Sequence, residues 1–341
     1  MKVLFIGGTG IISTASTRLA AERGIDLTLL RRGQHTSDVP RNFSSISADI
    51  TDEAAVAEAL GNQSFDAVVD WVAYTAADVE RDIRLFRGRT NQFIFISSAS
   101  AYQKPVGHYL ITESTPLANP YWQYSRDKIA CEERLMKAYR EESFPITIVR
   151  PSLTYGDTQI VLAVNSWLKP WTAVDRMRRG KKVIVPGDGS SLWVATHNSD
   201  FAQGLVGLLG HQQAIGHAFH ITSDEVLTWD QFYRITAQAA GVEAQIVHIA
   251  SDFVSACLPD EVGGLTGDKA VSVVFDNSKI KRFVPGYCAK VPFSQGIQRT
   301  IAWFDDDSRR KQVDEDANAS WDKLIDAYES GLEGALRQFR P

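Results

Sequence analysis

The 341-residue sequence has little cysteine, no cluster of histidines and no long apolar segment. Its three cysteines, Cys131, Cys257 and Cys288, lie far apart and match neither a metal site nor a disulfide framework. We therefore expect reduced thiols, no bound metal and a cytoplasmic protein. The apolar stretch at residues 1–6 runs into glycines and is too short to cross a bilayer, so it predicts a strand rather than a signal peptide or membrane anchor.

The sequence also lacks a strong excess of charge of one sign. It has 36 basic and 41 acidic residues and a formal net charge of −5 at pH 7, so general nucleic-acid binding is not expected. A hydrophobic content of 44% with 23% charged residues is typical of a soluble globular chain. The length suits one large domain or two modest ones.

A glycine-rich turn follows the first apolar run. Residues 3–6 predict a strand buried on both faces, and residues 11–23, ended by Gly24, predict a helix. Glycines between a strand and a helix N-terminus let a pyrophosphate approach the backbone N–H groups and the positive end of the helix. We expect a dinucleotide site here, with a plain turn as the alternative; Ser13 stands where a third glycine is usual. The residues expected to line the site are Gly7, Thr9, Gly10, Ile11 and Ile12.

The second predicted strand, residues 25–30, ends at Arg31 and Arg32. In a dinucleotide-binding fold this strand end meets the adenosine ribose, and an acidic residue there would bind the 2′-hydroxyl of NAD. An arginine instead suits the 2′-phosphate of NADP. NADP is therefore the favoured cofactor and NAD the alternative, unless the two arginines are merely solvated.

Strands and helices alternate up to residue 149. Strands are predicted at 44–48, 66–72, 93–96 and 146–149, and helices at 52–60, 75–87 and 121–142. This alternation predicts an α/β fold, a Rossmann-type doubly wound parallel sheet whose ligands lie beyond the carboxyl ends of the strands. Besides the residues above, those ends hold Asp49, Trp71, Val72, Ala73, Ser97, Ser98, Pro151 and Ser152.

The pattern of the sequence changes after Arg150. We expect residues 1–155 to form the dinucleotide-binding domain, with 190–212 returning to it, and 156–341 to form mainly a smaller mixed α/β substrate-binding domain. The basic run at 176–182 is interpreted as a solvated helix end, or alternatively as a grip for a substrate diphosphate. The amphipathic helices at 75–87 and 121–142 predict pairing into a homodimer.

Tyr124 and Lys128 lie four residues apart near the start of a predicted helix, so they point the same way. A nearby ammonium stabilises the phenolate form of a tyrosine, whose ordinary pKa is about 10. Such a tyrosine can exchange a proton with a substrate hydroxyl or carbonyl. A hydroxyl in the serine-rich loop that follows residues 93–96, such as that of Ser98, would bind the same substrate oxygen.

Together these motifs resemble the extended short-chain dehydrogenase/reductases, in the NAD(P)-dependent epimerase/dehydratase group. The likeness runs from Val3 to about Phe283. Its segments are Gly-Gly-Thr-Gly-Ile-Ile-Ser at 7–13, Ala-Asp-Ile-Thr-Asp at 48–52, Phe-Ile-Ser-Ser-Ala-Ser-Ala-Tyr at 95–102, Tyr-Ser-Arg-Asp-Lys at 124–128, Val-Arg-Pro-Ser-Leu-Thr-Tyr-Gly at 149–156, Val-Pro-Gly-Asp-Gly at 185–189, Thr-His-Asn-Ser-Asp at 196–200 and Phe-Asp-Asn-Ser-Lys at 275–279.

The resemblance implies a role for each matching residue. Ser98 would orient the substrate oxygen, Tyr124 would be the acid/base, and Lys128 would hold the nicotinamide ribose and tune Tyr124. The other implied cofactor contacts are Asp49 and Ile50 at the adenine and Trp71, Val72 and Ala73 beside the pyrophosphate and ribose. Members of the group move a hydride between a sugar carbon and NAD(P), which implies an epimerase, dehydratase or reductase acting on a secondary alcohol or ketone of a sugar-like substrate.

The substrate contacts are less defined. Trp193 stands about where nucleotide-sugar enzymes of the group carry an arginine, so a nucleotide sugar is one option among sugar-like substrates. Candidate substrate residues are Ser98, Ser100, Tyr102, Trp193 and His197. A looser resemblance to chloroplast stem-loop RNA-binding proteins, through residues 7–9 and 32–33, suggests an alternative: a cofactor-binding protein that binds RNA or regulates without turnover.

Overall fold

The computed structural model describes residues 1–33 and 43–339, and the chain divides into two compact units. Unit 1 contains Met1–Gly156, Thr196–Asp224 and Phe275–Lys290, and unit 2 contains Asp157–Ala195, Glu225–Val274 and Val291–Pro341. The chain thus returns to unit 1 twice. The second return, at Phe275–Lys290, lies in the part of the sequence expected to form the second domain, whereas residues 190–195 of the expected first return lie in unit 2.

Unit 1 is built on a parallel sheet. Within the described ranges its seven strands have the order β12-β7-β5-β4-β1-β2-β3. Their bounds are β1 Lys2–Ile6, β2 Asp26–Arg31, β3 Ser44–Ser47, β4 Ala67–Asp70, β5 Phe93–Ile96, β7 Ile146–Arg150 and β12 Ala218–His220. Strand order reverses between β1 and β4, where Val3 lies opposite Ala67, and such a reversal opens a ligand crevice in doubly wound sheets. The predicted Rossmann-type fold is confirmed.

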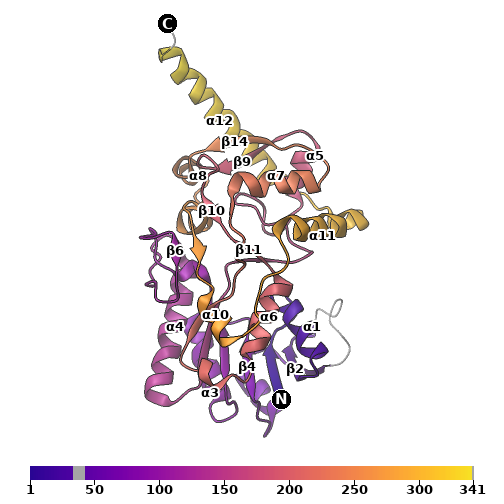
Figure 1. Cartoon of the computed structure of the whole chain (residues 1–341), viewed down its shortest axis with the longest axis vertical. Coiled ribbons are helices and arrows are strands. Elements are labelled where there is room, and N and C mark those ends of the chain that lie inside the picture. Colours follow the sequence, from indigo (N-terminus) through magenta and orange to yellow (C-terminus); the bar gives the residue numbers. More distant parts are fainter. Residues whose placement is uncertain (34–42, 340–341) are drawn as a thin grey trace. The chain divides into compact units, whose positions relative to one another are not determined.

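Helices cover both faces of this sheet. They are α1 Ser13–Glu22, α2 Glu53–Leu60, α3 Ala76–Phe86, α4 Gln123–Glu142, α6 Asn198–Leu208 and α10 Ser278–Phe283. Side chains of β1 alternate between the faces: Val3 and Phe5 belong to the core with α1 and α6, and Leu4 and Ile6 to the core with α2, α3 and α4. Figure 1 shows α1 and α6 side by side. Both faces are therefore buried, which explains the continuous apolar strands.

The returns of the chain to unit 1 have a packing reason. The first return forms α6 and then β12, which pairs with β7 so that Phe219 lies opposite Val149. The second forms α10, whose Ile280 is buried in the core that contains Phe219. Both segments are short, and their partners are far away in the sequence.

Unit 2 is a smaller mixed α/β unit. It contains the parallel pair β9 Lys182–Pro186 and β14 Gln245–Ile249 and the antiparallel pair β10 Leu192–Trp193 and β13 Leu227–Thr228. Its helices are α5 Thr172–Arg178, α7 Trp229–Ala239, α8 Ser251–Cys257, α9 Glu261–Gly264, α11 Phe293–Asp306 and α12 Glu315–Phe339. The remaining short strands of the chain are β6 Leu110–Ile111, β8 Leu153–Tyr155, β11 Ala195–His197 and β15 Val274–Phe275.

The basic run at 176–182 contains the end of α5, where Arg178 and Arg179 are exposed as expected, but its first arginine is buried. Arg176 is 1% exposed, and its guanidinium donates to Asp322 Oδ1 at 2.7 Å. Lys181 Nζ lies 2.7 Å from Asp322 Oδ2, and Lys182 binds Glu329. These ion pairs tie α5 and β9 to α12, so this run is occupied by contacts within unit 2.

No helix in the described part of the chain combines the length and the apolar character needed to cross a membrane.

Candidate functional site

The glycine turn lies where β1 ends, at the reversal of strand order. Gly7 and Gly8 have φ angles of +92° and +98°, which L side chains rarely adopt. A Cβ on Gly7 would lie 3.0 Å from Val72 Cγ1, at the end of β4. Bare backbone is therefore required here, and the predicted contacts Gly7 and Val72 are neighbours.

The start of α1 is shaped for an anion. Within the described residues no side chain caps this helix, and its first turn holds no acidic residue. Ser13 Oγ, in place of a third glycine, accepts from Gly10 N at 2.8 Å and closes the turn that leads into the helix. Helix N–H groups and the positive end of the helix dipole attract phosphate. The backbone of Gly7–Ile12 thus fits the pyrophosphate of a dinucleotide.

Asn198, at the start of α6, was not among the predicted site residues. Its Nδ2 donates to Ile11 O at 2.7 Å and so ties the glycine turn to the start of α6. The segment 196–200 was part of the family resemblance, and that is the signal by which Asn198 could have been found.

Charged side chains gather at the end of β2. Arg31 Nε donates to Ser45 Oγ at 3.2 Å, and Arg32 NH1 lies 3.9 Å from Asp49 Oδ2. Hydrogen bonds from the backbone and hydroxyl of Thr51 hold the pKa of Asp49 below its usual value. The predicted adenosine-end residues thus lie at one sheet edge, together with Ile50, which packs on the core with α2.

Lys128 is a buried ammonium with a defined position. It is 3% exposed on α4, and its Nζ donates to Ala73 O at 2.7 Å and to Ile96 O at 2.9 Å. These carbonyls belong to the ends of β4 and β5, and they use two of the three N–H groups of the ammonium. Burial lowers the pKa of Lys128 to about 8, and the charge of Asp70 opposes this decrease.

Tyr124 lies one helical turn before Lys128, as the spacing predicts. Its half-buried ring packs on Trp122 and Tyr74, with centroid distances of 5.0 and 6.2 Å. Lys128 Nζ lies 5.9 Å from the centre of the Tyr124 ring. An ammonium at this range stabilises the anionic form of a phenol, so the pair is arranged for acid–base chemistry.

Ser98 is oriented by a chain of hydroxyls. Its Oγ lies 2.9 Å from Ser100 Oγ, which accepts from Ser125 Oγ at 2.8 Å. Asn119 Nδ2 donates to the carbonyl of Ser100 at 2.9 Å. This chain connects Ser98 to α4, the helix that also carries Tyr124. Ser100, expected to contact substrate, is 4% exposed and orients Ser98.

Ser97 has a different environment from its neighbour. It is 2% exposed, and its Oγ donates to Glu132 Oε1 at 2.5 Å. The Glu132 carboxylate also accepts hydrogen bonds from Nε and NH2 of Arg150, at 2.9 and 2.6 Å. This buried ion pair ties the ends of β5 and β7 to α4. The predicted cofactor contacts Pro151 and Ser152 follow directly, and Pro151 O accepts from the start of the serine loop at 2.8 Å.

Tyr102, expected to contact substrate, is buried. Its hydroxyl lies 3.0 Å from His220 Nδ1, and the Arg150 guanidinium lies 4.9 Å from the ring centre. Burial raises the pKa of Tyr102 above its ordinary value. The geometry thus gives Tyr102 a supporting position behind the serine loop.

The two remaining candidate substrate residues are also buried. His197 caps α6, with its Nδ1 accepting from Ser199 N at 3.3 Å. Trp193 lies in unit 2, 2% exposed, and its ring stacks on Trp229 at 5.6 Å. Their roles toward a substrate stay predictions.

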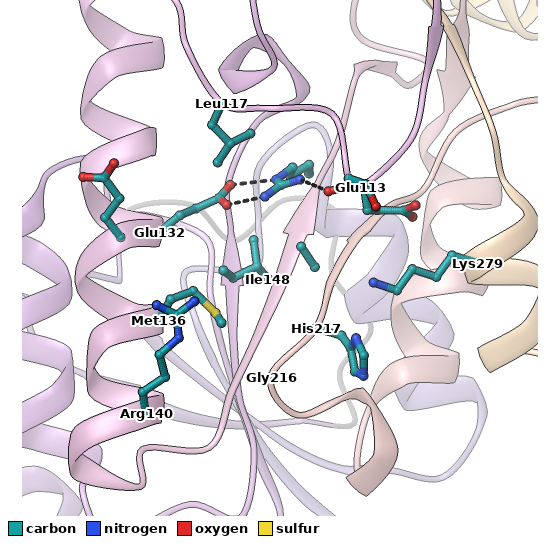
Figure 2. A pocket seen from close by; sticks show the side chains of 13 residues that line it. Glu113, Leu117, Glu132, Met136, Arg140, Ile148, Gly216, His217 and Lys279 are labelled. Atoms are coloured by element: carbon teal, nitrogen blue, oxygen red, sulfur yellow. Dashed lines mark hydrogen bonds and ion pairs between the residues drawn. The ribbon is translucent and has the colours of Figure 1, made fainter.

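A pocket of about 440 Å³ lies at the edge of the sheet, over Ile148 of β7 and Ala218 of β12 (Figure 2). Lys279 points into it from α10, and burial lowers the pKa of this lysine. Glu132 borders it where it binds Arg150. Among the described residues that line it, none is a predicted catalytic residue, so we do not assign the pocket to the reaction.

The chain is similar to several known proteins. The chain is 25% identical to 2'-dehydrokanamycin reductase of Streptomyces kanamyceticus, over 84% of this chain and 80% of that protein. It is also 25% identical to the chloroplast stem-loop binding protein of 41 kDa b of Arabidopsis thaliana, over 72% of this chain and 65% of that protein. The structure of dTDP-glucose 4,6-dehydratase from Bacillus anthracis, in complex with NAD, has a TM-score of 0.70 and 18% identity and covers 91% of this chain and 98% of its own.

A family model also matches the chain. The sequence profile of the NAD dependent epimerase/dehydratase family matches residues 3–222, which include every predicted catalytic residue. The resemblance drawn from the motifs, and the enzyme class that it implies, are thereby confirmed. The chain belongs to the NAD dependent epimerase/dehydratase family.

Proposed function

We propose that this protein transfers a hydride between NADP and a secondary alcohol or ketone of a sugar-like molecule, as a reductase, dehydratase or epimerase. The observation that carries the proposal is the position of Lys128. Its ammonium is held by Ala73 O and Ile96 O one helical turn from Tyr124, and a hydroxyl chain orients Ser98 from the same helix.

Each residue has a distinct task in this proposal. A bound nicotinamide supplies or accepts the hydride at the substrate carbon. Ser98 binds the substrate oxygen, and Tyr124 exchanges a proton with it. The Lys128 ammonium stabilises the Tyr124 phenolate, and its remaining N–H group is available to a ribose hydroxyl of the cofactor.

The cofactor proposal rests on the end of β2. A 2′-phosphate would gain two nearby cations in Arg31 and Arg32, whereas a 2′-hydroxyl would gain no acidic partner at the position of Arg31. Asp49 is the acidic residue nearby, and its ionised carboxylate pairs with Arg32. We assign it to the adenine rather than to the ribose. NAD is the alternative, since the family is described as NAD dependent.

The substrate proposal rests on the chemistry of the site and on one relative. A reductase of 2′-dehydrokanamycin, as its name states, reduces a keto derivative of an aminoglycoside, and that substrate is sugar-like but carries no nucleotide. The buried Trp193 offers no charge to a diphosphate, so we favour sugar-like ketones without a diphosphate over nucleotide sugars.

The test is turnover with defined substrates. The purified protein would be incubated with NADPH or NADP⁺ and a panel of keto-aminoglycosides, aminoglycosides, ketoses and UDP- and dTDP-hexoses. Nicotinamide absorbance reports net reduction or oxidation, and product NMR reports epimerisation or dehydration, in which the hydride is returned. We expect conversion of at least one sugar-like substrate and loss of that conversion in Tyr124→Phe.

The second candidate is RNA binding without turnover, favoured by the similarity to the chloroplast stem-loop binding protein. A filter-binding assay with structured RNA, run at two salt concentrations, separates the two. Submicromolar, salt-sensitive binding together with no reaction across the panel would support RNA binding. The net charge of −5 and the Ser98, Tyr124 and Lys128 arrangement, which a binding protein does not need, favour the enzyme.

A further inference from the structure

Two carboxyl groups are completely buried behind the predicted catalytic lysine. Asp70 ends β4, Asp82 lies on α3, and both are 0% exposed. Asp70 Oδ1 accepts from Val72 N at 2.7 Å and from Ala73 N at 3.0 Å. The carbonyl of Ala73 in turn receives Lys128 Nζ at 2.7 Å. Asp70 therefore fixes the loop that holds the ammonium.

The second oxygen of each carboxyl group lacks a donor. Among the described residues, neither Asp70 Oδ2 nor Asp82 Oδ2 has an N–H or hydroxyl donor, and the two carboxyl groups interact with each other directly. Two carboxylates cannot donate, so a bond between them requires one proton. Without a shared proton, two interacting negative charges would be buried together, and their desolvation would be very costly in free energy.

The remaining charges around the pair are consistent with one shared proton. On α3, Arg81 Nε donates to Asp82 Oδ1 at 3.0 Å and its NH1 donates to Asp78 Oδ1 at 3.1 Å. Two cations, Arg81 and Lys128, thus accompany three carboxyl groups. One proton on the pair makes the cluster electrically neutral.

The proton is best placed on Asp82. Asp70 receives two backbone N–H groups, which favour its ionised form. Burial and the negative charge of Asp70 raise the pKa of Asp82 well above its usual value, against the opposing effect of Arg81. The other groups that act on Lys128 are Asp78 on α3 and Cys131 and Glu132 on α4. Of these, Asp70 has the largest effect that favours the charged lysine.

We propose that Asp70 is the positioning residue of Lys128, holding its ammonium in place through Ala73 and keeping it charged, while Asp82 carries the shared proton. This inference rests on the proposed function only where it predicts an effect of Asp70 on the rate of turnover. The arrangement of charges can be tested without turnover.

The direction of the expected effect follows from the sign of the charges. Lys128 is charged below its pKa and neutral above it, and a nearby negative charge raises that pKa. In Asp70→Asn the amide still accepts the two backbone N–H groups, but the negative charge with the largest effect on Lys128 is lost, and the remaining carboxyl ionises on α3 beside Arg81. The titration of Lys128 then moves to lower pH. Asp82→Asn replaces a neutral acid with a neutral amide, so the titration stays in place.

The experiment is an NMR titration of the full-length protein labelled with [ε-¹³C]lysine. The Lys128 signal, assigned by its loss in Lys128→Met, is expected to titrate near pH 8 in the unmodified protein. We expect a decrease of about one pH unit in Asp70→Asn and an unchanged midpoint in Asp82→Asn. An unchanged midpoint in Asp70→Asn, or equal decreases in both variants, would overturn the proposal.

A second measurement keeps the test decisive if Asp70→Asn does not fold. The infrared spectrum at neutral pH should contain the carbonyl stretch of a buried protonated carboxylic acid, and Asp82→Asn should lose it. Absence of that band, or its persistence in Asp82→Asn, contradicts the shared proton.

The kinetic readout separates this inference from the proposed function. In Asp70→Asn the alkaline decrease of kcat/KM should begin at lower pH, whereas a purely structural defect would reduce the rate equally at every pH. If the protein has no turnover at all, the proposed function fails while the NMR result still decides the role of Asp70.

Discussion

At the scale of single residues, the proposed function gives the hydroxyl of Ser98 the task of binding the substrate oxygen. Ser98→Ala would remove this proposed hydrogen bond, and we expect kcat to decrease by about 10²-fold. Ser98→Thr keeps a hydroxyl and should retain more of the rate. Steady-state kinetics with the substrate identified in the panel gives both values. Equal rates in the alanine and threonine variants would contradict the role of the hydroxyl.

The neighbouring Ser97 is expected to contribute to the stability of the fold rather than to the reaction. Ser97 Oγ donates to a buried carboxylate, so Ser97→Ala is expected to lower the free energy of unfolding by about 1–3 kcal/mol.

In the proposed function, Arg31 decides the choice between NADP and NAD. Arg31→Ala removes a cation that would pair with a 2′-phosphate, so KM for NADPH should increase by about tenfold more than KM for NADH. Kinetics with each cofactor measures the two ratios. Arg337→Ala, an exposed arginine on α12, is the matched control. If KM for NADH increases as much as KM for NADPH, Arg31 does not recognise the phosphate.

At the scale of elements, one buried ion pair joins three of them. Glu132 on α4 is 3% exposed and binds both Arg150 at the end of β7 and Ser97 at the end of β5. Glu132→Ala leaves the arginine charge buried and unpaired, so we expect the free energy of unfolding to decrease by about 3–5 kcal/mol.

Urea denaturation measures this decrease. The matched control is Glu53→Ala, which breaks an ion pair with Arg84 whose two side chains are 40% and 52% exposed and which should change stability little. Similar decreases in the free energy of unfolding in both variants would show that the buried ion pair contributes no more to stability than the exposed one.

The elements near the start of the chain were predictable because their signals are local. Continuous apolar runs predicted β1 and β5, and the caps Asp52 and Thr75 mark the starts of α2 and α3 to within one residue. Tyr124 and Lys128 share a face by helical spacing alone.

Other parts of the site depend on contacts between distant segments. Nothing near Ser97 in the sequence indicates that its hydroxyl binds Glu132, 35 positions away. Ser100 and Tyr102 read as loop residues open to a substrate, but Ser125 and His220 occupy their hydroxyls. Nothing near the basic run at 176–182 indicates that Arg176 is buried, because its partner Asp322 lies far along the chain.

At the scale of the whole molecule, the same limit applies to the two units. The local pattern of the sequence does not indicate that Phe275–Lys290 belongs to unit 1. That return depends on Ile280 entering a core built by β1, α6 and β12, and a short helix carries little periodic signal of its own.

The expected homodimer belongs to this scale. α3 and α4 pack against each other on one face of the sheet, and pairing with the same helices of a second copy would bury their outer surface. Sedimentation equilibrium across the micromolar range should give twice the 37.8 kDa mass of the chain. A single species of 37.8 kDa at every concentration would contradict the dimer.

The most direct test of the central claim compares the unmodified protein with Tyr124→Phe. The variant keeps the ring packing on Trp122 and Tyr74 and removes only the hydroxyl to which we assign the proton exchange. We predict a decrease in kcat of about 10²–10⁴-fold, with a cofactor Kd, measured by calorimetry, that changes less than about twofold. Near-normal turnover in Tyr124→Phe would contradict the claim that this protein performs acid–base-assisted hydride transfer through Tyr124.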